Sequence, residues 1–138
     1  MIERYEEFIG MYTDVYEDGF CSHMISEFER LCDARIVRSR RETENVNKTV
    51  KDDYQYGMNV KNNCISHYNN RCVNQIFAEG LQYCFDLYAD KFDVLRDVHL
   101  IGSDFKIQKT PPGSGYHVWH AEQGNSELSR RSLVYMLY

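Results

Sequence analysis

The hydrophobic positions of this chain follow a helical period in two separate stretches. In FCSHMISEFERLCDAR, residues 20–35, apolar side chains recur every three or four positions, which predicts a helix over residues 22–34 with Ser22 as its N-cap. The same spacing runs from about Asn70 to Phe92 and predicts a second, longer helix. Gly80 lies inside it and costs about 1 kcal/mol relative to alanine, which does not abolish the pattern. The chain therefore provides two amphipathic helices.

Other stretches have the shorter period and the composition of strands. FIGMYTDVY, residues 8–16, predicts a short strand that ends in a turn at 17–19, just before the first helix. DFKIQKT, residues 104–110, alternates apolar and polar side chains, and PPGSG after it predicts a turn. RSLVYMLY, residues 131–138, is β-branched and aromatic to the last residue, which predicts a further strand.

The order of these elements indicates the class of fold. The stretch 37–63 is polar and weakly periodic, so it predicts an exposed loop or ragged edge strands. Helices followed by separately turned strands favour an α+β fold with a mainly antiparallel sheet. A length of 138 residues fits a single domain over 1–138.

Composition and charge narrow the classes of protein. An aromatic content of 14% is too high for a disordered chain, and a net charge of -5 does not imply nucleic-acid binding, although Arg38, Arg40 and Arg41 cluster. The five cysteines include no CxxC pair, so we expect them to be reduced and mostly small core residues. The sequence shows neither a signal peptide nor an apolar stretch long enough to span a membrane, which predicts a cytoplasmic protein without a membrane partner.

Candidate chemistry concentrates in GYHVWHAEQG, residues 115–124. If this stretch is extended, His120 and Glu122 project from one face of a strand, while His117 and Trp119 project from the other. We expect Trp119 in the core and His117 outside the ligand set. An imidazole and a carboxylate side by side, joined by a histidine from another strand, would form the facial triad that binds Fe(II). The alternative is a solvated strand face, because an isolated His-x-Glu often arises by chance.

The stretch KIQKTPPGSGYHVWHAE followed by RRSLVYMLY resembles the first half of the catalytic core of the Fe(II)- and 2-oxoglutarate-dependent dioxygenases, specifically the prolyl-4-hydroxylase-like group. VYEDGFCSHMISEFERL resembles the short strand and helix that open these enzymes. The resemblance implies N-terminal helices packed on a partial double-stranded β-helix, a jelly-roll-like sheet, as the form of the α+β fold. It also implies Fe(II) as the metal and 2-oxoglutarate as the cosubstrate.

The resemblance assigns roles to five residues. His120 matches the first iron-binding histidine, and Glu122 matches the iron-binding carboxylate, where the family more often has aspartate. Tyr138 lies where the family has a tyrosine that helps hold 2-oxoglutarate, and Thr110 lies where it often has another. Tyr116 matches a position on the substrate side of the pocket.

Two parts of the family pattern have no match in this sequence. The family's second iron-binding histidine and the basic residue that holds 2-oxoglutarate lie downstream of the matched motif, whereas His23, His67 and His99 lie upstream. We expect these three histidines to be structural or solvated. The chain is therefore predicted to be the N-terminal portion of an oxygenase domain that is inactive alone, with its sheet truncated after an apolar strand.

Other functions stay open at this point. The chain could be a non-catalytic scaffold that binds a protein partner through the 37–63 loop or through its terminal strand by β-augmentation. A cupin-like or hydrolytic metal site could use His117, His120 and Glu122 together. The substrate is undetermined between peptidyl proline, another side chain, a nucleobase and a small metabolite.

Overall fold

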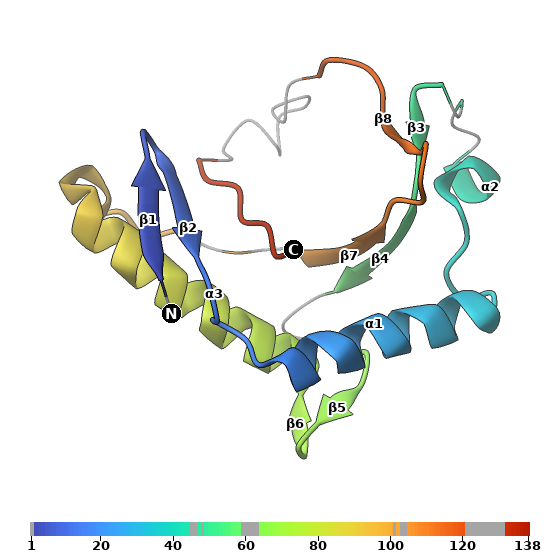
Figure 1. Cartoon of the computed structure of the whole chain (residues 1–138), viewed down its shortest axis with the longest axis horizontal. Coiled ribbons are helices and arrows are strands. Elements are labelled where there is room, and N and C mark those ends of the chain that lie inside the picture. The colour runs from blue at the N-terminus through green and yellow to red at the C-terminus, as the bar shows by residue number, and fades with distance from the viewer. Residues whose placement is uncertain are drawn as a thin grey trace. The chain divides into compact units, whose positions relative to one another are not determined.

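The computed structural model describes residues 2–44, 47, 49–58, 64–100, 102, 105–120 and 132–138 (Figure 1). The chain divides into two compact units, Met1–Val37 with Gln55–Ile107 and Arg38–Tyr54 with Gln108–Tyr138. Helices alternate with short strands that pair two by two within the described residues. The α+β class is therefore confirmed, whereas the double-stranded β-helix stays a prediction.

The first unit opens with a hairpin. Strands β1 (Glu3–Glu6) and β2 (Ile9–Tyr12) pair antiparallel, and Glu7 between them has a left-handed φ of 52°. The Tyr5 hydroxyl donates to the Leu87 carbonyl at 3.2 Å, and burial raises the pKa of Tyr5. The predicted strand at 8–16 is confirmed over β2. Its partner β1 was not predicted, because the sequence ERYE has too little apolar character to read as a strand.

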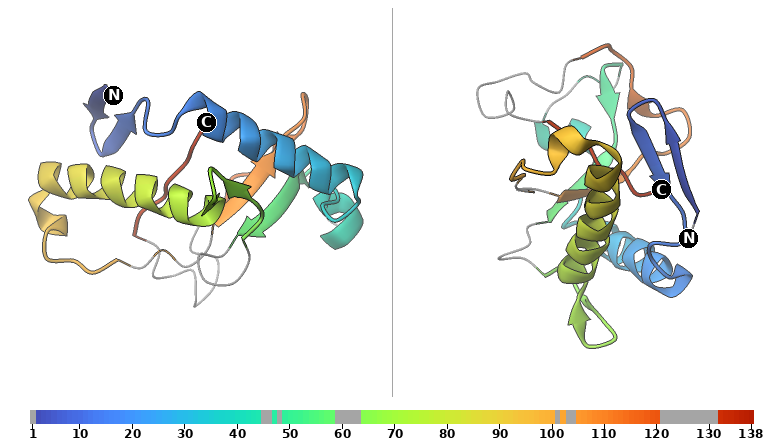
Figure 2. Two further views of the ribbon diagram at one scale, coloured as in Figure 1. Left: turned by 90° about the horizontal axis from the view of Figure 1, so that it is seen from below. Right: turned by 90° about the vertical axis from the view of Figure 1, so that its left-hand side faces the viewer.

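Two long helices form the body of the first unit (Figure 2). Helix α1 spans Asp18–Asp33, and helix α3 spans Val73–Lys91 and is followed by the short 3-10 helix η1 (Asp93–Leu95). Both helix predictions are confirmed. Ser22 is not the N-cap of α1, because the helix begins one turn earlier and Glu17 occupies that position. Asp18 in the first turn favours this earlier start through its interaction with the helix dipole.

The hydrophobic core of the first unit lies where α1, α3 and strand β4 meet. Its central side chains are Phe20, Met24, Met58 and Val73, all buried. Strand β4 (Tyr54–Met58) pairs with β7 (Phe105–Lys109), and the half-buried Phe105 and Ile107 of β7 pack on this core. The strand predicted from the alternation in DFKIQKT is thus confirmed over β7.

Gly80 allows a tyrosine to lie directly against α3. The ring of Tyr16 stacks on Phe20 at 5.3 Å and on Phe77 at 5.9 Å between centroids, and its hydroxyl donates to the Phe77 carbonyl at 2.7 Å. A Cβ atom at Gly80 would overlap the Tyr16 ring. The glycine that weakens the helical pattern in the sequence is therefore required by tertiary packing.

We expect Gly80→Ala to destabilise the protein, although alanine is the better helix former by about 1 kcal/mol. Overpacking a filled site costs about 1 to 3 kcal/mol, and the better helix propensity offsets about 1 kcal/mol of it, so the net loss should reach about 2 kcal/mol. Urea denaturation measures it. Gly57→Ala in β4 is the matched control, because its Cβ would meet no atom within 4 Å, and its stability should not fall. A Gly80→Ala variant as stable as the wild type would contradict this packing.

A second hairpin precedes α3. Strands β5 (His67–Tyr68) and β6 (Arg71–Cys72) pair antiparallel, and Asn69 and Asn70 both have left-handed φ values of 50° and 63°. Asparagine tolerates this conformation, and two such residues make the tight turn that suits a two-residue hairpin loop.

Two cysteines beside this hairpin are disulfide-bonded. Cys64 is joined to Cys72, so the prediction that all five cysteines are reduced is wrong. The hairpin folds the chain back on itself and brings these two residues together, which their spacing in the sequence did not reveal. Cys84 is buried as predicted, and Cys21 and Cys32 are half-buried.

The described part of the second unit contains short elements only. They are helix α2 (Arg40–Glu44) and strands β3 (Lys51–Asp52) and β8 (Gly115–Tyr116), with β3 and β8 paired antiparallel. The stretch 37–63 was predicted to be an exposed loop or ragged edge strands. Strands β3 and β4 form within it, whereas the prediction of exposure is wrong at the buried residues Val37, Ser39, Asp53 and Met58.

The C-terminal segment departs from the predicted strand. Residues 132–138 adopt no strand, and apolar side chains such as Val134 and Met136 are exposed. A segment that is apolar on both faces becomes a strand only when other strands pair with it and cover it. Within the described residues, 132–138 has no such partner strand. The part of the chain that the structure describes contains no helix long and apolar enough to cross a membrane.

Candidate metal site around His120

A tight turn brings the candidate residues to the end of strand β8. The Ser114 amide donates to the Pro111 carbonyl at 2.9 Å, and Gly113 has a φ of 79°, which favours glycine. This confirms the predicted turn at PPGSG. Strand β8 then pairs with β3, with Lys51 opposite Tyr116. The His117 amide donates to the Val50 carbonyl at 2.8 Å and extends this pairing by one hydrogen bond.

Tyr116 is the centre of a small stack of side chains. The imidazole of His120 lies on the Tyr116 ring, with centroids 3.9 Å apart and 24° between the planes. The ammonium of Lys51 lies 4.5 Å from the centroid of the same ring. The cross-strand register explains this second contact, because directly opposed residues of an antiparallel pair project from the same face. Tyr116 therefore connects β3 to the candidate ligand His120.

One hydrogen bond of His120 indicates which of its nitrogens carries a proton. Nδ1 lies 3.3 Å from the Val118 carbonyl oxygen, and a carbonyl can only accept a hydrogen bond. Nδ1 must therefore carry the proton. In the neutral imidazole Nε2 then holds the lone pair that a metal ligand needs, and a backbone carbonyl on the other nitrogen is a common partner of metal-binding histidines.

The predicted geometry of residues 117–122 is only partly described. Strand β8 ends at Tyr116, so His120 lies in an irregular segment and the strand expected through it is not formed there. Glu122 lies outside the described residues, so its placement on the same face as His120 stays a prediction. The prediction that Trp119 is a core residue is wrong, because its side chain is 104% exposed. His117 is exposed, and its ring lies 3.4 Å from the Cβ position of Gly115.

The two residues predicted to hold 2-oxoglutarate, Thr110 and Tyr138, do not belong to the stack formed by Lys51, Tyr116 and His120. Thr110 is exposed in the short connection after β7. Tyr138 is fully exposed, and its hydroxyl donates to the Met136 sulfur at 3.0 Å. Among the described residues, neither makes a hydrogen bond to Tyr116 or His120. Of the four predicted site residues that the structure describes, it therefore brings together Tyr116 and His120.

The donor groups can be compared with the needs of a metal ion. Within the described ranges, histidine, cysteine and carboxylate side chains nowhere gather in a group of three or more. His23, His67 and His99 agree with their predicted structural or solvated roles, since His23 Nε2 lies 2.9 Å from the Ser66 hydroxyl and the other two are exposed. His120 offers one suitable nitrogen, and a complete metal site would need donors beyond the described residues.

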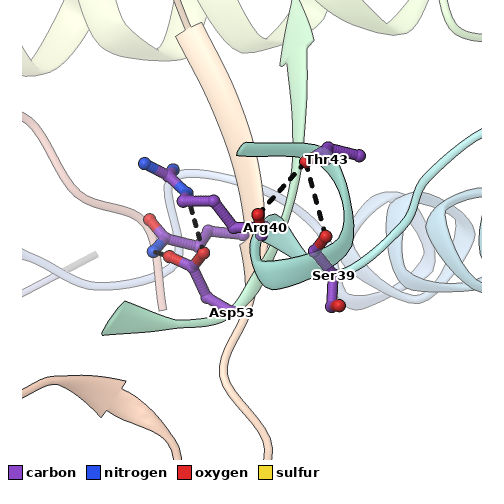
Figure 3. A network of polar contacts seen from close by, with 5 residues as sticks. Ser39, Arg40, Thr43 and Asp53 are labelled. Atoms are coloured by element: carbon purple, nitrogen blue, oxygen red, sulfur yellow. Dashed lines mark hydrogen bonds and ion pairs between the residues drawn. The ribbon is translucent and has the colours of Figure 1, made fainter. Parts of the chain in front are cut away.

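A polar network centred on the buried Asp53 lies at the end of strand β3 (Figure 3). Asp53, the residue after β3, accepts a hydrogen bond at 3.0 Å from Arg40 Nε and another from the Gln108 amide. Its backbone carbonyl accepts from the Arg40 amide at 2.8 Å. The Thr43 hydroxyl lies 3.4 Å from the carbonyls of both Ser39 and Arg40. This network fixes α2 and β7 to the end of the strand that carries Lys51.

Comparison with known proteins adds no relative. Neither a protein-family model, nor a curated protein, nor a solved structure matches this chain. Any function of this chain must therefore be inferred from its residues and their geometry.

Sequence reasoning missed Lys51 and Asp53. Both lie in the polar stretch 37–63, where no periodic pattern distinguishes them from solvated charges. Their roles depend on pairing with residues more than fifty positions away, Tyr116 for Lys51 and Gln108 for Asp53. The only local sign of a charged network is at Asp53, because two carboxylates follow the cation in Lys51-Asp52-Asp53.

Proposed function

We propose that this chain carries the first part of the core of an Fe(II)- and 2-oxoglutarate-dependent oxygenase, with His120 and Glu122 as two of the iron ligands. The observation that supports it best is the state of His120. Its ring is stacked on Tyr116, and the Val118 carbonyl fixes the proton on Nδ1. Both features prepare Nε2 for a metal, and they occur at the histidine that the resemblance assigns as a ligand.

Fe(II), when bound, would supply the oxidative decarboxylation of 2-oxoglutarate by dioxygen and the hydroxylation of a substrate. The chain's own residues would hold and orient the reactants. His120 and Glu122 would bind the metal, and Tyr116 would keep the imidazole in place. Tyr138 and Thr110 would contact 2-oxoglutarate. No histidine follows His120 in this sequence, so the stretch around His120 and Glu122 supplies two ligands of the triad.

Several classes of substrate fit the proposed hydroxylase. Peptidyl proline, another side chain, a nucleobase and a small metabolite all fit a hydroxylase of this kind. The proposed location is the cytoplasm, as predicted from the sequence. Disulfides such as that between Cys64 and Cys72 are more common in oxidising compartments.

Titration with Mn(II), a redox-inert substitute for Fe(II), tests the proposal. We expect His120→Ala to weaken binding at least tenfold, because it removes a ligand, and Tyr116→Leu to weaken it by about tenfold, because loss of an orienting partner typically costs that much. Electron paramagnetic resonance of the free Mn(II) measures both. His99→Ala is the matched control, since His99 is exposed and outside the stack. Equal binding by His120→Ala and the wild type would contradict the proposal.

A second candidate function is a non-catalytic scaffold that binds a protein partner. Exposed apolar side chains of the second unit favour it, namely Val118, Trp119, Leu133, Val134, Met136 and Leu137. The buried residues of the described part of that unit are the polar Ser39 and Asp53, so its apolar groups are available for contact. A folded chain that binds no Mn(II) would favour the scaffold over the oxygenase.

A further inference from the structure

The first unit contains a cleft of about 420 Å³ that the proposed oxygenase chemistry does not use. It lies between the amino end of α1, the middle of α3 and the β5–β6 hairpin, which all belong to the same unit. Its volume falls in the range of small-molecule sites. The side chains that line it include Tyr16, Phe20, Tyr68, Ile76 and Tyr83.

Aromatic rings form much of the wall. Phe20 is buried behind the cleft, and the Tyr68 ring meets it edge to face, with centroids 5.8 Å apart and 74° between the planes. Tyr83 comes from α3 and is 48% exposed, so its ring is accessible from solvent. Rings of this kind attract cations through the negative potential of their faces.

The charged groups of the cleft have an acidic balance. Glu17 and Glu79 supply two carboxylates, and Arg71 supplies one guanidinium, which is paired with Glu79. The Tyr68 hydroxyl donates a hydrogen bond to the Glu17 carboxylate, and desolvation and then this hydrogen bond raise the pKa of Tyr68. Glu17 and Asp18 also offset the positive dipole end of α1, which would otherwise favour an anion.

We propose that this cleft binds a small organic cation, an alkylammonium group with a short apolar body. The aromatic walls would contact the apolar body and attract the charge, and the carboxylate of Glu17 would balance that charge. A carboxylate or phosphate ligand would meet a net charge of the same sign. This site is independent of the residues around His120, so it stands or falls separately from the oxygenase proposal.

The test compares choline with 3,3-dimethyl-1-butanol, which has the same shape without the charge. Titrations at low salt are followed by chemical-shift changes in the nuclear magnetic resonance spectrum of the whole chain. We expect choline to bind at least fivefold more tightly than the alcohol. Tyr83→Leu should weaken choline binding at least fivefold, and Glu17→Gln at least threefold. Phe8→Leu is the control, since this exposed aromatic residue of the first unit does not line the cleft, and it should leave choline binding unchanged.

A third probe separates two sources of the same cation. Nα-acetyl-lysine methylamide carries an ammonium group on a peptide-like backbone, so tighter binding than that of choline would identify the ligand as a lysine of a protein. Both variants should keep the fold, because Tyr83 is half exposed and the Glu17 side chain makes no capping hydrogen bond. Equal binding of choline and the alcohol, no binding of either cation, or unchanged binding by Tyr83→Leu would overturn the proposal.

Discussion

Replacement of Asp53 by alanine is expected to lower the free energy of unfolding by about 3 to 5 kcal/mol. The Asp53 side chain is 1% exposed, and its two oxygens accept hydrogen bonds from Arg40 and Gln108. The Arg40 side chain is itself mostly buried, with 12% exposed. Removing the carboxylate would deprive a poorly solvated guanidinium of the Asp53 charge, and breaking a buried ion pair by removing one partner is costly.

The matched control for Asp53 is a second carboxylate that pairs with arginine at a similar distance. Glu27 contacts Arg30 at 2.9 Å on α1, where the arginine side chain is 58% exposed and the glutamate side chain 20%. Glu27→Ala should cost less than about 1 kcal/mol, because water screens the exposed pair. Chemical denaturation of the two variants measures the difference. Equal losses would show that the Asp53 network contributes no more than a surface pair.

Replacement of Phe20 by alanine should have an effect of similar size, about 3 to 5 kcal/mol. Phe20 is 1% exposed, and it contacts the rings of both Tyr16 and Tyr68. Truncation removes the largest buried side chain at the junction of α1 with the β5–β6 hairpin and leaves a cavity that the surrounding rings can only partly fill.

Ile25 on the same helix provides the control for Phe20. Its side chain is 64% exposed, so Ile25→Ala should change the free energy of unfolding by less than about 0.5 kcal/mol. Both variants replace a large apolar residue of α1 with alanine, the best helix former. A change in helix propensity therefore cannot explain a lower stability of either variant. Thermal melting followed by circular dichroism checks them. A loss in Phe20→Ala no greater than in Ile25→Ala would contradict the assignment of the core.

Helices were predictable from the sequence because their signals are local. The apolar side chains of α1 that are buried, Phe20, Met24, Phe28 and Leu31, are those whose spacing of three and four indicates one helical face. The start of α1 was placed a turn too late, because Ser22 is a good capping residue and Glu17 a poor one. Strand β7 was equally clear, since its alternation lies within five residues.

Features that depend on distant partners were not predictable. Strands β3 and β8 are two residues long each, so neither has a period, and only their pairing defines them. The disulfide between Cys64 and Cys72 requires the β5–β6 turn, which the sequence analysis did not identify. The apolar run at 131–138 shows the opposite error, since strong strand propensity does not make a strand without a partner.

In the candidate site too, local features were predictable from the sequence and features that depend on the fold were not. The motif identified His120 and Tyr116 from the sequence, and the structure places their rings in contact. The motif could not reveal that Lys51 lies on Tyr116, or that the Val118 carbonyl sets the tautomer of His120, because both depend on backbone geometry. Alternation predicted a core position for Trp119, but alternation requires a strand, and β8 ends before this residue.

We propose that a divalent metal ion binds at His120. The most direct measurement is the paramagnetic broadening of assigned nuclear magnetic resonance signals by substoichiometric Mn(II), which acts only on nuclei near the bound ion. The account predicts that signals of His120, Glu122 and Tyr116 broaden first, that those of His67 and His99 stay sharp, and that His120→Ala abolishes the pattern. Broadening centred on another histidine, or spread evenly over exposed carboxylates, would contradict it.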